Sequence, residues 1–444
     1  MTHRSTRALV ALIPLAVLAT AAVPLAAQTA DLRAEIDRRA VGVNAKVVAW
    51  RRDIHQHPEL GNRELRTASL VADHLRGLGL QVRTGVAHTG VVAVLTGGRP
   101  GPVVALRADM DALPVTELAP VPFASKVRTT YNGQDVGVMH ACGHDNHVAI
   151  LMGVAEVLAG MRDRLPGTVK FVFQPAEEGP PEGERGGAEL MLEEGAFDAP
   201  RPAAIFGLHV WPLPVGQISY RPGGQLAAAD GLRIVVRGKQ THGAAPWAGI
   251  DPIVTASQIV LGLQTIVSRQ QDLTKAPAVV TIGEIRGGVR SNIIPDSLVM
   301  VGTIRTLDPA MRTDVHERVR RTAEHIAASA GATANVRITP NYPLTVNDTA
   351  LTRWAAPTLE RVAANGKAYH GPPILGAEDF SYFAQQVPGL FFFLGVVPEG
   401  QDPARAPANH SPLFFADEAA LPVGVRALAH LAVDYLSRAR PGAD

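Results

Sequence analysis

Hydrophobic positions change their spacing several times along the chain, and each change predicts a different element. From about residue 34 apolar residues recur every three or four positions, and the same spacing over 65–78 predicts a second opening helix. Short apolar runs bounded by turn residues then predict strands at 91–95, 103–106, 169–173 and 203–208, with helices at about 145–160 and 187–194. This alternation predicts an α/β fold with a doubly wound, mostly parallel sheet covered by helices on both faces.

Between residues 226 and 340 the predicted order becomes strand, helix, strand, strand, helix, strand. Both helices begin with Asp-Pro, at Asp251-Pro252 and Asp308-Pro309, which is an N-cap acid followed by proline at the first helical position. Such a β-α-β-β-α-β unit forms a ferredoxin-like two-layer sandwich. The α/β alternation resumes after it. We therefore expect a discontinuous larger domain of residues 28–225 and 341–444, with the smaller domain, 226–340, inserted into it.

The N-terminus carries the pattern of a secretory signal peptide. Two arginines precede an acid-free apolar run at 8–23, and small residues follow up to Ala27. A single membrane anchor is the alternative, but the run is shorter than the ~20 residues that a spanning helix needs, and two prolines interrupt it. We expect residues 1–27 to be removed on export to the periplasm or the exterior, which leaves a mature chain without a membrane segment.

Composition narrows the choice of partners. The 444 residues are 46% hydrophobic and 19% charged, as in a soluble protein with two or three domains. Lysine and arginine number 42 against 41 acids, so no global basic field favours nucleic acid or an anionic membrane. A single cysteine excludes an intramolecular disulfide and a thiolate-rich metal cluster, whereas histidines number 15. Any recognition must therefore depend on specific local contacts.

Polar side chains gather where the predicted strands end. Ligands of a doubly wound sheet bind at the carboxyl ends of its strands. The residues at these ends, in the loop before the helix at 145 and near the C-terminus are Asp109, Asp111, His140, Cys142, His144, Asp145, His147, Glu177, Glu178, His209, Asn409 and His410. Thiolate, imidazole and carboxylate together predict a metal site. Adjacent Glu177 and Glu178 point in different directions, so one can bind metal while the other holds a water molecule.

Several ordered segments resemble the M20 metallopeptidase family. They include His-Ala-Cys-Gly-His-Asp at 140–145 and Gln-Pro-Ala-Glu-Glu-Gly at 174–179. The others lie at 52–60, 107–114, 292–296, 302–305, 376–380 and 409–412. The resemblance covers residues 45–436 and is to the amidohydrolase branch, with its hippurate, N-acyl-amino-acid and indole-acetyl-amino-acid hydrolases.

The resemblance implies a centre of two divalent metal ions with Glu177 as general base. The implied ligands are Cys142, His144, Glu178, His209 and His410. Zn²⁺, Mn²⁺ and Co²⁺ all suit this ligand set. Other branches of the family have a metal-binding His-x-Asp where this chain has Asp109 and Asp111. We interpret Cys142 and His144 as the replacement, and Asp111 as a carboxylate that orients a ligand.

The resemblance also assigns roles to the inserted domain. His242 is implied to polarise the substrate carbonyl and stabilise the oxyanion, and Asn292 and Arg305 to hold the substrate carboxylate. Trp247 stands where many relatives have a second histidine, which predicts a more apolar pocket. Relatives often dimerise through this domain, so a homodimer is a further expectation. Because the site residues are divided between two domains, we expect the smaller domain to close as a lid.

The predicted function is that of a secreted two-metal amidohydrolase that cleaves N-acyl or N-aroyl amino acids of the hippurate type. A dipeptidase or carboxypeptidase of the same family is the alternative. The residues leave two other classes open. Cys142 could act as a thiolate nucleophile in an amidase, which requires an unligated and reactive thiol. A binding protein on an enzyme scaffold is the non-catalytic alternative, against which the intact Glu177 argues.

Overall fold

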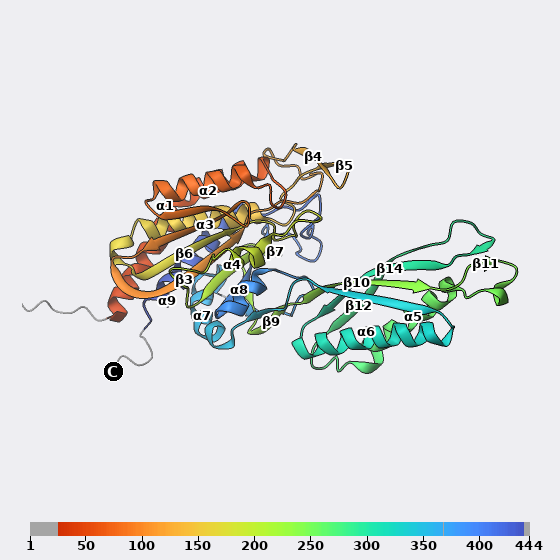
Figure 1. The fold of residues 1–444 in the computed structure, drawn as a ribbon. Coiled ribbons are helices and arrows are strands. Elements are labelled where there is room, and N and C mark those ends of the chain that lie inside the picture. The colour runs from red at the N-terminus through yellow and green to blue at the C-terminus, as the bar shows by residue number, and fades with distance from the viewer. Residues whose placement is uncertain (1–24, 367, 439–444) are drawn as a thin grey trace, which may run out of the picture.

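The computed structural model describes residues 25–366 and 368–438, and its larger part is built on one mixed sheet (Figure 1). The strands of this sheet are β1 (Gln81–Val86), β2 (Gly90–Thr96), β6 (Pro166–Gln174), β3 (Arg99–Asp109), β7 (Ile205–Pro214), β18 (Gly389–Val397), β8 (Ile218–Tyr220) and β17 (Ala368–His370), in that spatial order. The central strands β6, β3, β7 and β18 are parallel. Strands β1, β2 and β8 pair antiparallel at the flanks. The predicted α/β fold with a mostly parallel sheet is confirmed.

Helices cover both faces of this sheet because its strands alternate their buried side chains. Phe392 packs with α1 (Leu25–Gln56), α2 (Leu65–Gly77), α3 (His144–Ala159), α7 (Thr349–Val362) and α9 (Leu421–Leu436). Its neighbours Phe391 and Phe393 pack on the opposite face with α4 (Gly187–Glu193) and α8 (Phe380–Gln386). The segment Glu418–Leu436 is long and apolar enough to cross a membrane, but 78% of its most apolar window is buried, as in a core helix. The predicted signal peptide lies outside the described residues except for 25–27, with which α1 begins.

A second sheet extends away from the first, as Figure 1 shows. Its strands, in spatial order β12 (Ala278–Gly287), β14 (Ser297–Thr306), β10 (Ala228–Arg237) and β15 (Thr333–Pro340), pair antiparallel. Helices α5 (Pro252–Thr265) and α6 (Pro309–Ser329) pack against it through one hydrophobic core. Each helix is capped as expected: the Asp251 carboxylate accepts from the Ile253 and Val254 amides, and that of Asp308 from the Met311 amide. Whether this unit is a lid or a dimer contact stays a prediction.

Smaller elements complete the described chain. Two-stranded pairs are formed by β4 (Arg128–Tyr131) with β5 (Gln134–Gly137), by β9 (Gly223–Leu226) with β16 (Thr345–Asn347), and by β11 (Thr241–His242) with β13 (Ile293–Ile294). Short 3₁₀ turns lie at Arg162–Arg164, Pro246–Ala248, Ala364–Gly366 and Glu418–Ala420, and a π turn at Ile266–Gln270. The β11–β13 pair lies at the tip of the second sheet, at the end distant from the first sheet (Figure 1).

Candidate metal centre

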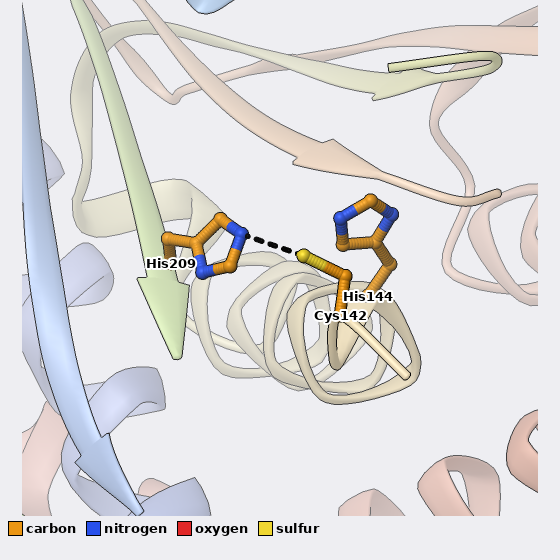
Figure 2. A group of neighbouring side chains, drawn as sticks. All are labelled: Cys142, His144 and His209. Carbon is orange, nitrogen blue, oxygen red and sulfur yellow. Dashed lines mark hydrogen bonds between the residues drawn. The ribbon is translucent and has the colours of Figure 1, made fainter. Parts of the chain in front are cut away.

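A thiol and two imidazoles lie together where the start of α3 meets the middle of β7 (Figure 2). Cys142 Sγ lies 3.3 Å from His209 Nε2, and both side chains are buried beside His144. Gly143, between Cys142 and His144, has φ +95°, and a Cβ there would lie 2.4 Å from Val210 Cγ2. Only glycine suits this turn. Since His209 Nδ1 donates to the Val210 carbonyl at 2.7 Å, its Nε2 lone pair faces the thiol.

Asp111 holds His144 and the loop that carries the two glutamates. One Asp111 oxygen lies 3.2 Å from His144 Nδ1, and the other accepts from the Glu178 amide at 2.9 Å. His144 Nε2 therefore points away, 3.8 Å from Glu177 Oε2, and has no hydrogen-bond partner among the described residues. This is the placement expected of a carboxylate that orients a ligand.

The C-terminal loop closes the group from the other side. His410 Nε2 lies 2.9 Å from Glu178 Oε1 as an ion pair, without the angles of a hydrogen bond. The His410 backbone, with φ +71°, donates its amide to the Ala141 carbonyl at 2.8 Å. Asn409 Nδ2 donates to the Cys142 carbonyl at 2.8 Å. These bonds tie the loop to the cysteine.

All the predicted ligands meet here, and their donor atoms fit two divalent cations. The ligand atoms of Cys142, His144 and His209 lie within 4.8 Å of one another, and so do those of Cys142, Glu178 and His410. His144 Nε2 is buried without a hydrogen bond among the described residues, which is costly unless a cation binds it. Sulfur, nitrogen and oxygen donors together suit Zn²⁺, Mn²⁺ or Co²⁺.

The electrostatics of the group also favour a bound cation. Burial and the nearby Glu378 and Glu178 raise the pKa of Glu177 well above its ordinary value. Burial and the charges of Glu178 and Glu177 likewise raise the pKa of the Cys142 thiol. Burial alone would lower the pKa of His144, but neighbouring aspartates raise it to about 10. A buried, protonated thiol is a weak nucleophile, which counts against a thiol-dependent amidase.

A buried charge cluster lies directly beneath the site, and sequence reasoning assigned it no role. The Arg107 side chain is fully buried and contacts Asp109 at 2.6 Å, Glu378 at 2.8 Å and Asp379 at 3.1 Å. Asp109 in turn contacts His147 Nδ1 at 2.5 Å. In the sequence, Arg107, Asp109, Glu378 and Asp379 stood out only as parts of the segments 107–114 and 376–380, and nothing in either segment showed that they pair. The cluster supports Asp109 and the 378–379 segment beside the candidate ligands.

A cavity of about 720 Å³ opens above these residues and reaches the second sheet. Glu177, Glu178 and His410 line one side, and Arg305 of β14 and Tyr342, just after β15, line another. Arg305 is half-buried, and burial lowers its pKa. No hydrogen bond or ion pair of its side chain occurs within the described part of the chain. It is therefore free to bind an anion inside the cavity.

His242 and Asn292 lie elsewhere. Both are exposed, and they meet at the tip of the second sheet, where the Gly243 amide donates to the Asn292 carbonyl at 2.8 Å. Neither lines the cavity. Figure 1 places β11, which carries His242, at the far end of the second sheet from β7. A single chain in this arrangement therefore does not bring the two residues to the candidate ligands.

Comparison with known proteins gives consistent matches. Residues 105–434 match the model of peptidase family M20/M25/M40. The chain is 41% identical over 395 residues to "Thermostable carboxypeptidase 2" of Saccharolobus solfataricus, which covers 88% of this chain and 96% of that protein. It is also 41% identical to "IAA-amino acid hydrolase ILR1-like 2" of Arabidopsis thaliana, over 88% of this chain and 85% of that protein. A solved structure, the Bacillus subtilis YXEP protein described as a dinuclear metal-binding M20 peptidase, matches with TM-score 0.74 and 38% identity, over 89% of this chain and 99% of that one.

Proposed function

Because the chain belongs to peptidase family M20, we propose that it is a two-metal amidohydrolase of N-acyl amino acids with Glu177 as its general base. One observation carries the proposal. The buried Glu177 carboxylate lies 3.8 Å from a candidate metal ligand, His144, and lines a cavity that is also lined by Arg305, a cation without an ion pair among the described residues. A base, a cation site and an anion site thus share one cavity, as hydrolysis of an amide next to a carboxylate requires.

The residues divide the work of hydrolysis. Two divalent cations, when bound, polarise the amide carbonyl and lower the pKa of an attacking water molecule. The residues that would hold these cations are Cys142, His144, Glu178, His209 and His410. Glu177, which is not needed as a ligand, takes the proton from the water and delivers it to the leaving amine. Its position in the cavity, 3.8 Å from His144 Nε2, places it beside the water that the cations would bind.

Replacing Glu177 by glutamine tests the base. We expect Glu177→Gln to lower kcat by at least about 100-fold while two metal ions per chain remain bound. Glu182→Gln, an exposed acid from the same loop that does not line the cavity, is the matched control and keeps its activity. Elemental analysis of both variants also identifies the metal, which we expect to be zinc or manganese. Normal turnover by Glu177→Gln would exclude the proposed role.

The substrate is proposed from the cavity wall. Trp211, Phe393 and Leu226 supply an apolar surface for an acyl or aroyl group, while Arg305 faces the position of a carboxylate. A carboxypeptidase is the second candidate, since a relative with 41% identity is named as one. Hydrolysis of hippurate, indole-acetyl, acetyl and long-chain acyl amino acids, compared with Gly- and Ala-dipeptides, separates the two. Faster cleavage of the dipeptides would favour the peptidase.

His242 reaches a cavity only if the second sheet rotates or a second chain supplies it. We propose a homodimer through the second sheet, whose helix α5 exposes Ile253, Val254 and Leu261 to solvent. Mixing His242→Ala with Glu177→Gln tests this. If His242 acts across the dimer, each mixed dimer has one intact site, and about a quarter of wild-type activity returns. No recovery, with mixed dimers present, would favour rotation within one chain.

Export is proposed from the leader at residues 1–27 alone. Fractionation of cells that express the full chain should place the enzyme outside the cytoplasm, with a new N-terminus near residue 28. A full-length product in the cytoplasmic fraction would contradict the proposal.

A further inference from the structure

Tyr342 lies where the chain returns from the second sheet to the first. It follows β15 by two residues and precedes β16. Its carbonyl accepts from the Ala229 amide at 3.0 Å, and the Asn341 amide donates to the Ala229 carbonyl at 3.1 Å. The two segments that connect the sheets are thus hydrogen-bonded to each other. The main chain of Tyr342 must move with this double connection when the second sheet changes its orientation.

The side chain of Tyr342 reaches the candidate base. Its hydroxyl donates to the Glu177 carbonyl oxygen at 2.6 Å, across 165 positions of sequence. Burial and the nearby Asp379 and Glu177 raise the pKa of this phenol well above its ordinary value, so the hydroxyl keeps its proton and remains a donor. The ring packs edge-on against Tyr382 with centroids 6.5 Å apart. The Tyr342 side chain is therefore fixed by its hydroxyl, through Glu177, and by its ring, through Tyr382.

The backbone around Glu177 depends on such contacts. Ala176 has φ +51°, a left-handed conformation that is unfavourable for an alanine. The Glu64 carboxylate accepts from the Ala176 amide at 2.8 Å, and that of Asp111 from the Glu178 amide at 2.9 Å. These two bonds come from the larger part of the molecule. The third, from Tyr342, comes from the connection to the second sheet.

We propose that Tyr342 is a positioning residue whose hydroxyl holds the Glu177 peptide in place. Because Tyr342 belongs to the connection between the sheets, the position of the Glu177 carboxylate then depends on the orientation of the second sheet. The inference rests on the proposed function of Glu177 and adds a link between domain movement and the base. When the connection moves, the Glu177 carbonyl loses its partner and the strained turn can relax. The carboxylate then leaves the position that proton transfer requires.

Tyr342→Phe tests the link by removing a single oxygen atom. We expect kcat to fall about 10- to 100-fold, because a displacement near 1 Å has that effect on a catalytic group. KM, the metal content of two ions per chain and the melting temperature should stay close to those of the parent. Tyr435→Phe is the matched control, because it also removes one hydroxyl. Tyr435 lies in α9, where its hydroxyl accepts from Arg438 at 2.5 Å, and it does not line the cavity. An unchanged kcat in Tyr342→Phe would overturn the proposal.

A double variant separates positioning from other effects. If the hydroxyl acts through Glu177, adding Tyr342→Phe to Glu177→Gln should lower the residual kcat by less than twofold. A full further 10-fold loss would mean that Tyr342 acts on the substrate or the fold directly, and would overturn the proposal. If Glu177→Gln itself stays active, the proposed function fails instead. Hydrogen exchange gives an activity-independent readout: residues 174–181 should exchange faster in Tyr342→Phe, and equal exchange would contradict the link.

Discussion

Replacing Arg107 by methionine leaves three buried carboxylates without their cation. Its partners Asp109, Glu378 and Asp379 are each at most 2% exposed. Deleting one member of a buried ion pair costs about 3–5 kcal/mol. The three costs do not add, because burial already raises the pKa of Glu378 and Asp379, and these two can take up protons. We therefore expect Arg107→Met to lose about 3–5 kcal/mol, or roughly 5–8 °C in the melting temperature of a domain of about 300 residues.

The loss should depend on pH in a defined direction. Burial alone would raise the pKa of Asp109, but Arg107 and two histidines hold it well below its ordinary value. In the variant, the folded state binds more protons than the unfolded state, since the buried carboxylates have folded pKa values above their unfolded ones. The contribution of these carboxylates to the free energy of unfolding is favourable at a pH below the pKa that they have in the unfolded state. It disappears as the pH rises through the pKa that they have in the folded state. The difference in melting temperature between Arg107→Met and the parent protein is therefore larger at about pH 8 than at about pH 5.

Circular dichroism melts in the presence of EDTA measure this gap without a contribution from metal binding. Arg52→Met, which breaks an exposed pair with Glu418, is the control and should change stability by at most about 1 kcal/mol. If Arg107→Met melts no earlier than the control, or if its gap narrows as the pH rises, the cluster does not stabilise the fold in the way described.

Other predictions concern the metal ions and the substrate. The pKa values of the Cys142 thiol and of His144 are raised, so a metal ion must displace protons from both groups when it binds. We therefore expect the affinity for zinc, measured by chelator competition, to rise about 10- to 100-fold per pH unit between about pH 6 and 8. An affinity that does not change with pH would count against these two ligands. His410→Ala should lower the metal content from two ions towards one by elemental analysis, and an unchanged content would remove His410 from the ligand set. Arg305→Met should raise KM about 10- to 100-fold for an acyl amino acid but not for its carboxamide, whereas equal effects on both would show that Arg305 does not bind the carboxylate.

The parts that could be predicted from sequence are those in which local pattern determines the outcome. Apolar runs predicted the central strands, and the Asp-Pro signals predicted the starts of α5 and α6. Residues after parallel strands converge on one edge of the sheet, which predicted the gathering of polar side chains there. The choice of Cys142 and His209 as ligands came from the family resemblance. Strands β8 and β17 were missed because three residues are too few to show a period.

Other features depend on long-range arrangement and left little trace in the sequence. The burial of Arg107 depends on Asp379, 272 positions away, and a charged residue within a strand does not reveal such a partner. The distance between His242 and the cavity depends on how the second sheet is oriented, which no motif encodes. The hydrogen bond from Tyr342 to Glu177 joins a domain connection to a main-chain carbonyl, and a carbonyl has no side-chain signature in the sequence.

The order of the ligands along the chain bears on when the centre can assemble. Cys142, His144 and His209 precede the second sheet, whereas His410 follows it, near the end of the chain. Strand β18, the parallel neighbour that supports β7 at His209, is also made late. During synthesis from the N-terminus, a nascent chain therefore holds four of the five predicted ligands, since Glu178 also precedes the second sheet, but it lacks His410 and the strand that supports β7. Because contacts between distant parts of the chain form slowly, the complete two-metal centre can assemble only late in folding, when His410 comes to lie beside Glu178.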